Sequence, residues 1–216
     1  MEIFATLLDI VLHLDVHLAA LLAQYGAWVY LILFAIVFCE TGLVVTPFLP
    51  GDSLLFVAGA LAATGGLDIG ILIPLLIAAA LIGDNVNYFV GRSIGPKVFS
   101  WEHSRFFNRR AFDKTHAFYE RHGGKTIIIA RFLPLVRTFA PFVAGIARMT
   151  YLRYLAFCVA GALLWVGSLG LAGYWFGNLP IIKENLTLVI LAIIAMSLAP
   201  LAIGYVRHRI AERRYA

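Results

Sequence analysis

The chain has 216 residues, of which 62% are hydrophobic and 13% are charged, and its mean hydropathy is +0.89. Soluble domains carry about 25% charged residues, so this composition excludes a soluble protein and predicts a single membrane domain over residues 1–216, with about four to six embedded segments of roughly 20 residues. The net charge of +5 does not indicate nucleic-acid binding, because the basic residues flank apolar segments, where the positive-inside rule accounts for them.

The first predicted element, residues 1–22, is an amphipathic helix that lies at the membrane interface. Its apolar sequence is interrupted by Asp9, His13 and His17, which share one helix face. We interpret the two histidines as part of a solvated polar face. A role in metal or proton binding is the alternative.

Residues 23–91 are predicted to form the first half of an internal repeat. An apolar helix runs to Glu40, a re-entrant segment broken by proline and glycine covers residues 41–62, and a full-length span covers residues 69–91. The long hydrophilic stretch that follows, residues 92–125, is predicted to be a basic amphipathic loop in the cytoplasm.

Residues 126–177 are predicted to form the second half of the repeat. A re-entrant segment covers residues 127–147, and a span covers residues 153–177. A last transmembrane helix is expected over residues 185–206, before a basic cytoplasmic tail over residues 207–216. Glycine-rich faces in the spans allow close packing of helices within one chain or between two chains. A homo-oligomer is therefore one of the alternatives that the sequence leaves.

Two short motifs recur at the same spacing. FVAG at residues 56–59 recurs at 142–145, and YFVG at 88–91 recurs as YWFG at 174–177.

Most of the 17 lysines and arginines lie where the positive-inside rule assigns them to the cytoplasm, provided that each re-entrant segment returns to the side it entered. The two halves then have opposite orientations. The expected fold is an all-α integral membrane protein, an inverted repeat of two re-entrant hairpins each followed by a transmembrane helix.

Each re-entrant segment contains residues that stop or bend a helix. The predicted hinges are Pro47, Pro50, Gly51, Pro134 and Pro141. Asp52 or Ser53 can cap the half-helix after the first break, and Thr138 can cap the one after the second, with Pro141 in its first turn. The two half-helix N-termini would offer free backbone donors and partial positive charge, which suits an anion.

Four charged residues lie in or beside the broken segments. An ionisable group at the bilayer centre costs roughly 2.5–3.5 kcal/mol on the insertion scale, so the acids Glu40 and Asp52 should pair with Arg131 and Arg137 or with a ligand. Arginine binds phosphate bidentately, and burial and arginine shift a carboxyl pKa in opposite directions, which suits proton coupling. The residues expected to bind a phosphate headgroup are Arg131, Arg137, Thr138 and Ser53. A helix cap at Asp52, a simple counter-ion at Glu40 and structural salt bridges at the arginines remain alternatives.

Three polar residues at the end of the 69–91 span are secondary candidates for lining the same cavity. Asp84 shares a helix face with Asn87 and with Tyr88, and hydrogen bonding between helices is the alternative role. Cys39 and Cys158 lie in apolar runs and are interpreted as buried small hydrophobic residues. No cofactor is expected, and the histidines form no compact pattern of metal ligands.

Four motifs resemble those of the DedA family, also described as the VTT or SNARE-associated membrane proteins. They are ETGLVVTPFLPGD at residues 40–52, GDNVNYFVGR at 83–92, FYERHGGK at 118–125 and ARFLPLVRTFAPFVAG at 130–145. The resemblance implies a multi-pass protein of the bacterial inner membrane with two opposed re-entrant hairpins. It also implies lipid translocation, in particular of undecaprenyl phosphate, that depends on the proton motive force. The functional acids of the family fall on Glu40 and Asp52, and its functional arginines fall on Arg131 and Arg137.

Three other functions compete with a carrier-lipid flippase. A general phospholipid scramblase could use the same site. A proton-coupled exporter of small cations would use the acids but would leave Arg131 and Arg137 without a role. A lipid-phosphate phosphatase is disfavoured, because no histidine lies in the broken segments or in any later span and no nucleophile–base pair is present. We therefore expect a transporter, not an enzyme.

Overall fold

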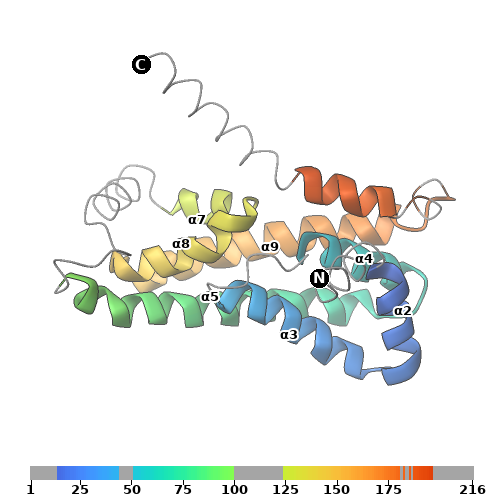
Figure 1. Cartoon of the computed structure of the whole chain (residues 1–216), viewed down its shortest axis with the longest axis horizontal. Coiled ribbons are helices and arrows are strands. Elements are labelled where there is room, and N and C mark those ends of the chain that lie inside the picture. Colours follow the sequence, from blue (N-terminus) through green and yellow to red (C-terminus); the bar gives the residue numbers. More distant parts are fainter. Residues whose placement is uncertain are drawn as a thin grey trace, which may run out of the picture. The chain divides into compact units, whose positions relative to one another are not determined.

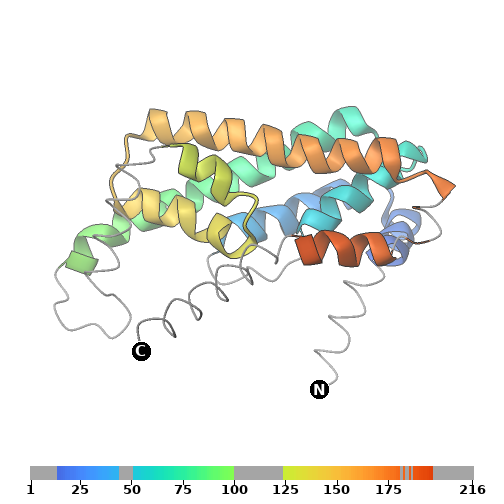
Figure 2. The ribbon, with the colours of Figure 1, turned by 90° about the horizontal axis from the view of Figure 1, so that it is seen from above.

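The computed structural model describes residues 14–43, 51–99, 124–180, 182, 185 and 187–196, and these residues form helices joined by turns (Figures 1 and 2). The helices are α2 (Leu14–Tyr25), α3 (Trp28–Gly42), α4 (Gly51–Ala63), α5 (Ile69–Phe99), α7 (Lys125–Ala130), α8 (Pro134–Ile146), α9 (Tyr151–Phe176) and a last helix over Thr187–Met196.

Two of the described helices are long and apolar enough to cross a bilayer. They are Ile69–Ile94 of α5 and Tyr151–Phe176, each of 26 residues. At 1.5 Å per residue each reaches about 39 Å, which exceeds the hydrocarbon thickness of about 30 Å. The shorter apolar helices α3, α4 and Thr187–Met196, with the Val136–Ile146 part of α8, do not reach that length. The fold is therefore all-helical in its described part, with long and short apolar helices together.

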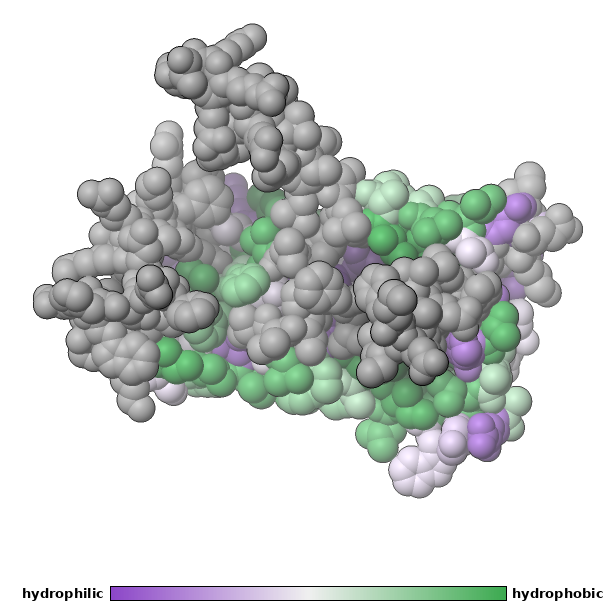
Figure 3. Space-filling view, viewed as in Figure 1, coloured by the Kyte–Doolittle hydropathy of each residue, from purple (hydrophilic) through white to green (hydrophobic). Residues whose placement is uncertain are grey.

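The described surface is apolar over much of its area, as Figure 3 shows for one face. Large side chains such as Leu31, Ile71 and Leu152 are more than half exposed. Soluble monomers rarely expose contiguous apolar patches of this kind. Such a surface fits contact with lipid.

In the first half of the chain, two helix boundaries differ from the sequence-based expectation. The first apolar helix was expected to start near Ala23, but the chain turns at Gly26, whose φ is +54°, and α3 begins at Trp28. Glycine adopts this left-handed conformation without steric cost, so Gly26 ends α2. At the other end of the region, α5 continues through Arg92 to Phe99, so the start of the predicted 92–125 loop is helical.

The chain divides into two compact units. Unit 1 comprises Met1–Ala27, Pro50–Ile69 and Leu169–Ala216, and unit 2 comprises Trp28–Leu49 and Gly70–Ser168. In unit 1, α2 packs against α4, and α4 is buried along most of its length. In unit 2, α8 packs against both α3 and α7. The core of unit 2 includes Tyr88, Ile127, Ala144, Tyr154 and Cys158.

The repeated FVAG motif makes the same kind of contact in each unit. In unit 2, a Cβ on Gly145 would overlap the carbonyl oxygen of Tyr88, and a Cβ on Gly91 would overlap that of Phe142. Glycine at both positions therefore lets α8 lie directly against α5.

Unit 1 shows the corresponding contact between α4 and α9. A Cβ on Gly59 would overlap the carbonyl oxygen of Gly170, and a Cβ on Gly173 would overlap that of Phe56. The sequence comparison aligned Gly91 with Gly177, whereas the contact places Gly173 in the role of Gly91, one helical turn earlier. Successive turns of a helix present the same face, so the motif keeps its function despite this shift. The repeat seen in the sequence is thus matched by a repeated helix–helix contact.

Candidate functional site

Unit 2 contains two buried pairs of arginine and carboxylate. Arg137 of α8 donates from Nη2 to Oε1 of Glu40, which lies in α3. Arg131, directly after α7, donates from Nη2 to Oδ2 of Asp84, which lies in α5. All four residues are at most 5% exposed. Removing such charges from water is costly unless they are paired, so each pair ties together two helices that are distant in sequence.

The break between α7 and α8 explains how two arginines close in sequence reach one place. Arg131 is the C-cap of α7, with its N–H donating to the carbonyl of Ile128. Leu133 has an extended backbone, with φ −116° and ψ +104°, as a following proline favours. Helix α8 then begins at Pro134, and Arg137 lies in its first turn. The two arginines therefore leave different elements, and both still line one small space.

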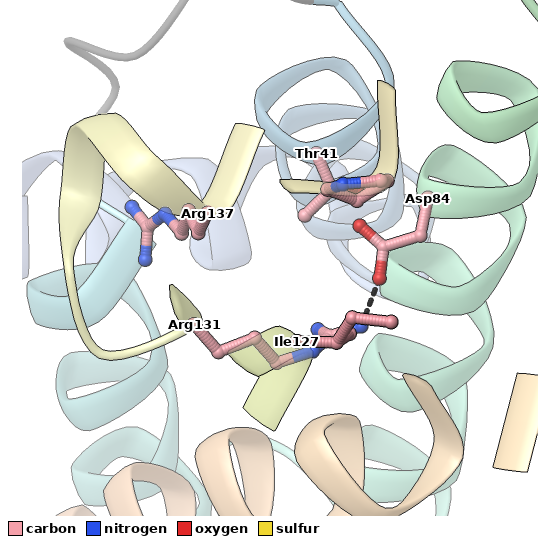
Figure 4. A pocket seen from close by; sticks show the side chains of 6 residues that line it. Thr41, Asp84, Ile127, Arg131 and Arg137 are labelled. Carbon is pink, nitrogen blue, oxygen red and sulfur yellow. Dashed lines mark hydrogen bonds and ion pairs between the residues drawn. The ribbon is translucent and has the colours of Figure 1, made fainter. Parts of the chain in front are cut away.

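That space is a small cavity of about 10 Å³ (Figure 4). Its lining residues are Thr41, Asp84, Ile127, Arg131, Arg137 and Pro141. A volume of this size holds about one water molecule and is too small for a phosphate group. In Figure 4 the side chains of Arg131 and Asp84 are joined across one side of the cavity by their ion pair. The arrangement is a closed site with its charges neutralised in pairs.

Helix α9 contributes further contacts to both pairs. Cζ of Arg137 lies 4.9 Å from the ring centroid of Trp165. The thiol of Cys158 donates to Oδ2 of Asp84 at 3.0 Å and accepts from Nη2 of Arg131 at 3.3 Å. Cys158 is buried as the sequence predicted, but it touches charged groups as well as apolar ones. The signal for this role was the spacing of seven residues between Cys158 and Trp165, which puts both on one face of the helix.

The three secondary candidates on α5 divide into two roles. Asp84 lines the cavity and is the partner of Arg131. Asn87 donates from Nδ2 to the carbonyl oxygens of Thr138 at 2.6 Å and Thr41 at 3.3 Å, so it links α5 to α8 and to the end of α3. Asn87 therefore joins helices, which is the alternative role that its spacing left open.

Tyr88 also forms a bond between elements. Its hydroxyl donates to the carbonyl oxygen of Met149 at 2.5 Å and accepts from Nη1 of Arg92 at 3.0 Å. Met149 lies in the turn after α8, next to Arg148, whose φ of +53° is unusual for a residue other than glycine. Tyr88 thus fixes the turn that joins α8 to α9.

The predicted capping of the second half-helix is wrong. The N-cap of α8 is Leu133, without a side-chain hydrogen bond, and Thr138 is buried inside the helix. Proline is favoured in the first helical turn, so the helix starts at Pro134, four residues before the expected cap. Pro141 consequently lies inside α8, not in its first turn, where it cannot donate a backbone hydrogen bond to the carbonyl of Arg137.

The residues predicted around the first break are described in part. Helix α4 begins at Gly51, so Asp52 lies in its first turn and Ser53 is buried. Both residues belong to unit 1, whereas Glu40 and the two arginines belong to unit 2. Pro47 and Pro50 lie outside the described residues. The structure therefore brings together Glu40 with Arg137, and it assigns Asp84 to Arg131 as a partner that the sequence did not identify.

Within the described residues, no group of three or more histidine, cysteine, aspartate or glutamate side chains could hold a metal ion. Guanidinium groups bind carboxylates and phosphates through forked hydrogen bonds. Arg131 and Arg137, which are both paired with carboxylates in the structure, are therefore the candidates for binding an anion.

The VTT domain matches residues 49–175 of the chain. The chain is 56% identical to Protein DedA of Escherichia coli K12 over all of both chains. It is 48% identical to an uncharacterized membrane protein of Mycobacterium leprae, over 78% of this chain and 76% of the relative. Inner membrane protein YghB of Escherichia coli K12 is 35% identical over 93% of this chain and 92% of its own length. No solved structure matches the chain.

Proposed function

Because the chain belongs to the DedA family of VTT-domain membrane proteins, we propose that it is a flippase for a polyprenyl-phosphate carrier lipid. The proposed substrate is undecaprenyl phosphate, and the proposed location is the bacterial inner membrane, with the C-terminus in the cytoplasm. The observation that carries the proposal is the pair of buried arginines around one cavity, each neutralised by its own carboxylate.

The paired charges support an exchange mechanism for headgroup binding. With both arginines paired, the site is neutral and can be buried without a ligand. A phosphate group that enters can replace Glu40 or Asp84, because its oxygens also accept hydrogen bonds from guanidinium and can accept two in a forked arrangement. The small volume of the cavity means that the helices carrying these residues must separate before a headgroup fits. The hydrophobic tail would stay in the lipid.

The same exchange supplies a route for proton coupling. A carboxylate that loses its arginine to phosphate is left buried without a cation, which is costly. Uptake of a proton removes that charge, and release of the headgroup would return the carboxylate to its arginine and expel the proton. Glu40 and Asp84 are therefore the proposed proton carriers in unit 2, while a coupling role for Asp52 stays a proposal from the sequence.

The repeated glycine contacts support the membrane topology that this function needs, an inverted repeat with re-entrant hairpins. Helices α4 and α8 are too short to span a bilayer, and each packs through an FVAG glycine on the part of a long helix that belongs to its own unit. We propose that both are halves of re-entrant hairpins in an inverted repeat. Two such hairpins of opposite orientation would give a headgroup access from either side in turn.

The experiment that tests the proposal is transport in proteoliposomes. Fluorescent undecaprenyl phosphate is the substrate, and a labelled phosphatidylglycerol in parallel vesicles tests for a general scramblase. Arg137→Ala should abolish movement of the carrier lipid. Because that change leaves Glu40 buried without its cation, Arg137→Lys is the second variant, which keeps the charge but loses the forked geometry.

Arg153, exposed near the start of α9, supplies the matched control. Arg153→Ala should transport like the wild type. Wild-type rates in both Arg137 variants would remove the phosphate-site mechanism. Equal rates for the carrier lipid and for phosphatidylglycerol in the wild type would replace the flippase with a scramblase.

A further inference from the structure

One stripe of α9 lies behind both arginines. Its members, Tyr154, Cys158, Gly161 and Trp165, are spaced so that they share one helix face. Each contacts a member of the two ion pairs. We infer that this α9 stripe positions the two guanidinium groups for the anion, with Trp165 acting on Arg137 and Gly161 acting on Arg131. The inference rests on the proposed function, since it takes an anionic headgroup as the ligand.

Trp165 holds Arg137 by its flat face. The ring is 1% exposed, and the guanidinium carbon lies over it at 4.9 Å from the centroid. A guanidinium over a ring face is attracted to the ring without using its N–H groups, which stay available for hydrogen bonds in the plane of the guanidinium. Glu40 occupies that edge in the closed site. When an anion replaces Glu40, Trp165 keeps Arg137 in the orientation that the anion requires.

Gly161 lets Arg131 lie directly against α9. A Cβ at this position would be 3.0 Å from both Cδ and Nε of Arg131, which is closer than side-chain atoms normally approach. Nε of Arg131 is buried and has no hydrogen-bond partner among the described residues. An unsatisfied buried donor is costly, so this nitrogen is available to an oxygen of the anion. Glycine at residue 161 therefore leaves room for the productive position of Arg131.

The remaining members of the stripe hold Asp84. The hydroxyl of Tyr154 donates to the backbone carbonyl of Asp84 at 2.8 Å, and the thiol of Cys158 donates to its carboxylate at 3.0 Å. Asp84 is thus fixed by α9 at two points while it faces Arg131. This helps to return the carboxylate to the arginine after the anion leaves.

The test is ligand binding to the full-length protein in detergent micelles. Farnesyl phosphate is the charged probe, and farnesol is the uncharged probe with the same tail. Trp165→Leu should weaken binding of farnesyl phosphate by roughly threefold to thirtyfold, the range of a buried cation–π contact, with Trp165→Phe between it and the wild type. Binding of farnesol should not change. Trp175→Leu is the matched control, because Trp175 lies on the same helix and is 64% exposed.

Gly161→Ala tests the second contact. It should weaken binding of farnesyl phosphate by roughly tenfold, because Arg131 must move away from the new methyl group and small misplacements of a binding group are costly. Gly167→Ala is the matched control on the same helix, since a Cβ there meets no atom within 4 Å. Both substitutions change helix propensity equally, so a difference between them reports the contact with Arg131.

The outcomes separate the inference from the proposed function. If the wild type prefers farnesyl phosphate and both α9 variants bind it like their controls, the positioning role is wrong and the proposed function stands. If the variants lose affinity for both probes equally, the stripe only supports the fold, which also contradicts the inference. If the wild type binds both probes alike, there is no anion-binding site, and both the positioning role of the α9 stripe and the proposed function are wrong.

Discussion

Replacing Asp84 by asparagine removes the negative charge that faces Arg131 while keeping the shape of the side chain. Both side chains of the pair are 5% exposed, so water cannot compensate the guanidinium that remains. Leaving one member of a buried pair without its partner costs about 3–5 kcal/mol. The loss should therefore be a large fraction of the stability of the protein.

The double variant Asp84→Asn with Arg131→Met separates the structural effect from the functional one. It contains no buried charge at this position, and apolar replacement of a buried pair is often neutral for stability. We expect it to recover at least about 2 kcal/mol of the loss in Asp84→Asn. Transport of the carrier lipid should stay absent in both variants, because one lacks the coupling acid and the other lacks an arginine of the site.

The assay is a four-member cycle of the wild type, the two single variants and the double variant. The free energy of unfolding is measured in mixed micelles by titration with a denaturing detergent, and flux is measured in proteoliposomes. Additive effects of the two substitutions would show that Arg131 and Asp84 do not interact. A double variant that transports at the wild-type rate would show that the pair has no part in the function.

Three further predictions test other parts of the structure. Glu40→Gln should flatten the dependence of transport on pH and on the proton gradient, and an unchanged profile in vesicles would remove Glu40 from coupling. Gly145→Ala should destabilise the protein by about 1–3 kcal/mol, because the methyl group would separate α8 from α5, whereas Gly167→Ala should not, as melting in detergent would show. Tyr88→Phe should cost about 0.5–1.5 kcal/mol through its lost bond to Met149, and the same melting temperature in both proteins would contradict that bond.

Sequence patterns were sufficient to predict those features of the protein whose physical cause lies in neighbouring residues. The apolar composition predicted a membrane protein, and the relatives named as membrane proteins confirm it. The family followed from contiguous motifs around Glu40 and Arg137, and the VTT match confirms it. The FVAG repeat was visible because helix contacts through glycine need that residue itself at each copy. Proline also acts on the backbone within a few residues. The sequence nevertheless predicted the wrong cap, Thr138, because Pro134 can either break a helix or begin one.

The sequence by itself determined which charged residues lie in apolar surroundings, because burial of charge can be read from the neighbours of Glu40, Arg131 and Arg137 along the chain. Only the tertiary structure decided which carboxylate pairs with which arginine. Asp84 is 47 residues from Arg131, and Glu40 is 97 residues from Arg137, and no periodicity relates positions at such separations. Pairing depends on how α3, α5 and α8 pack, and that packing is the sum of many weak contacts along whole helices. The approach of Trp165 to Arg137 has the same origin.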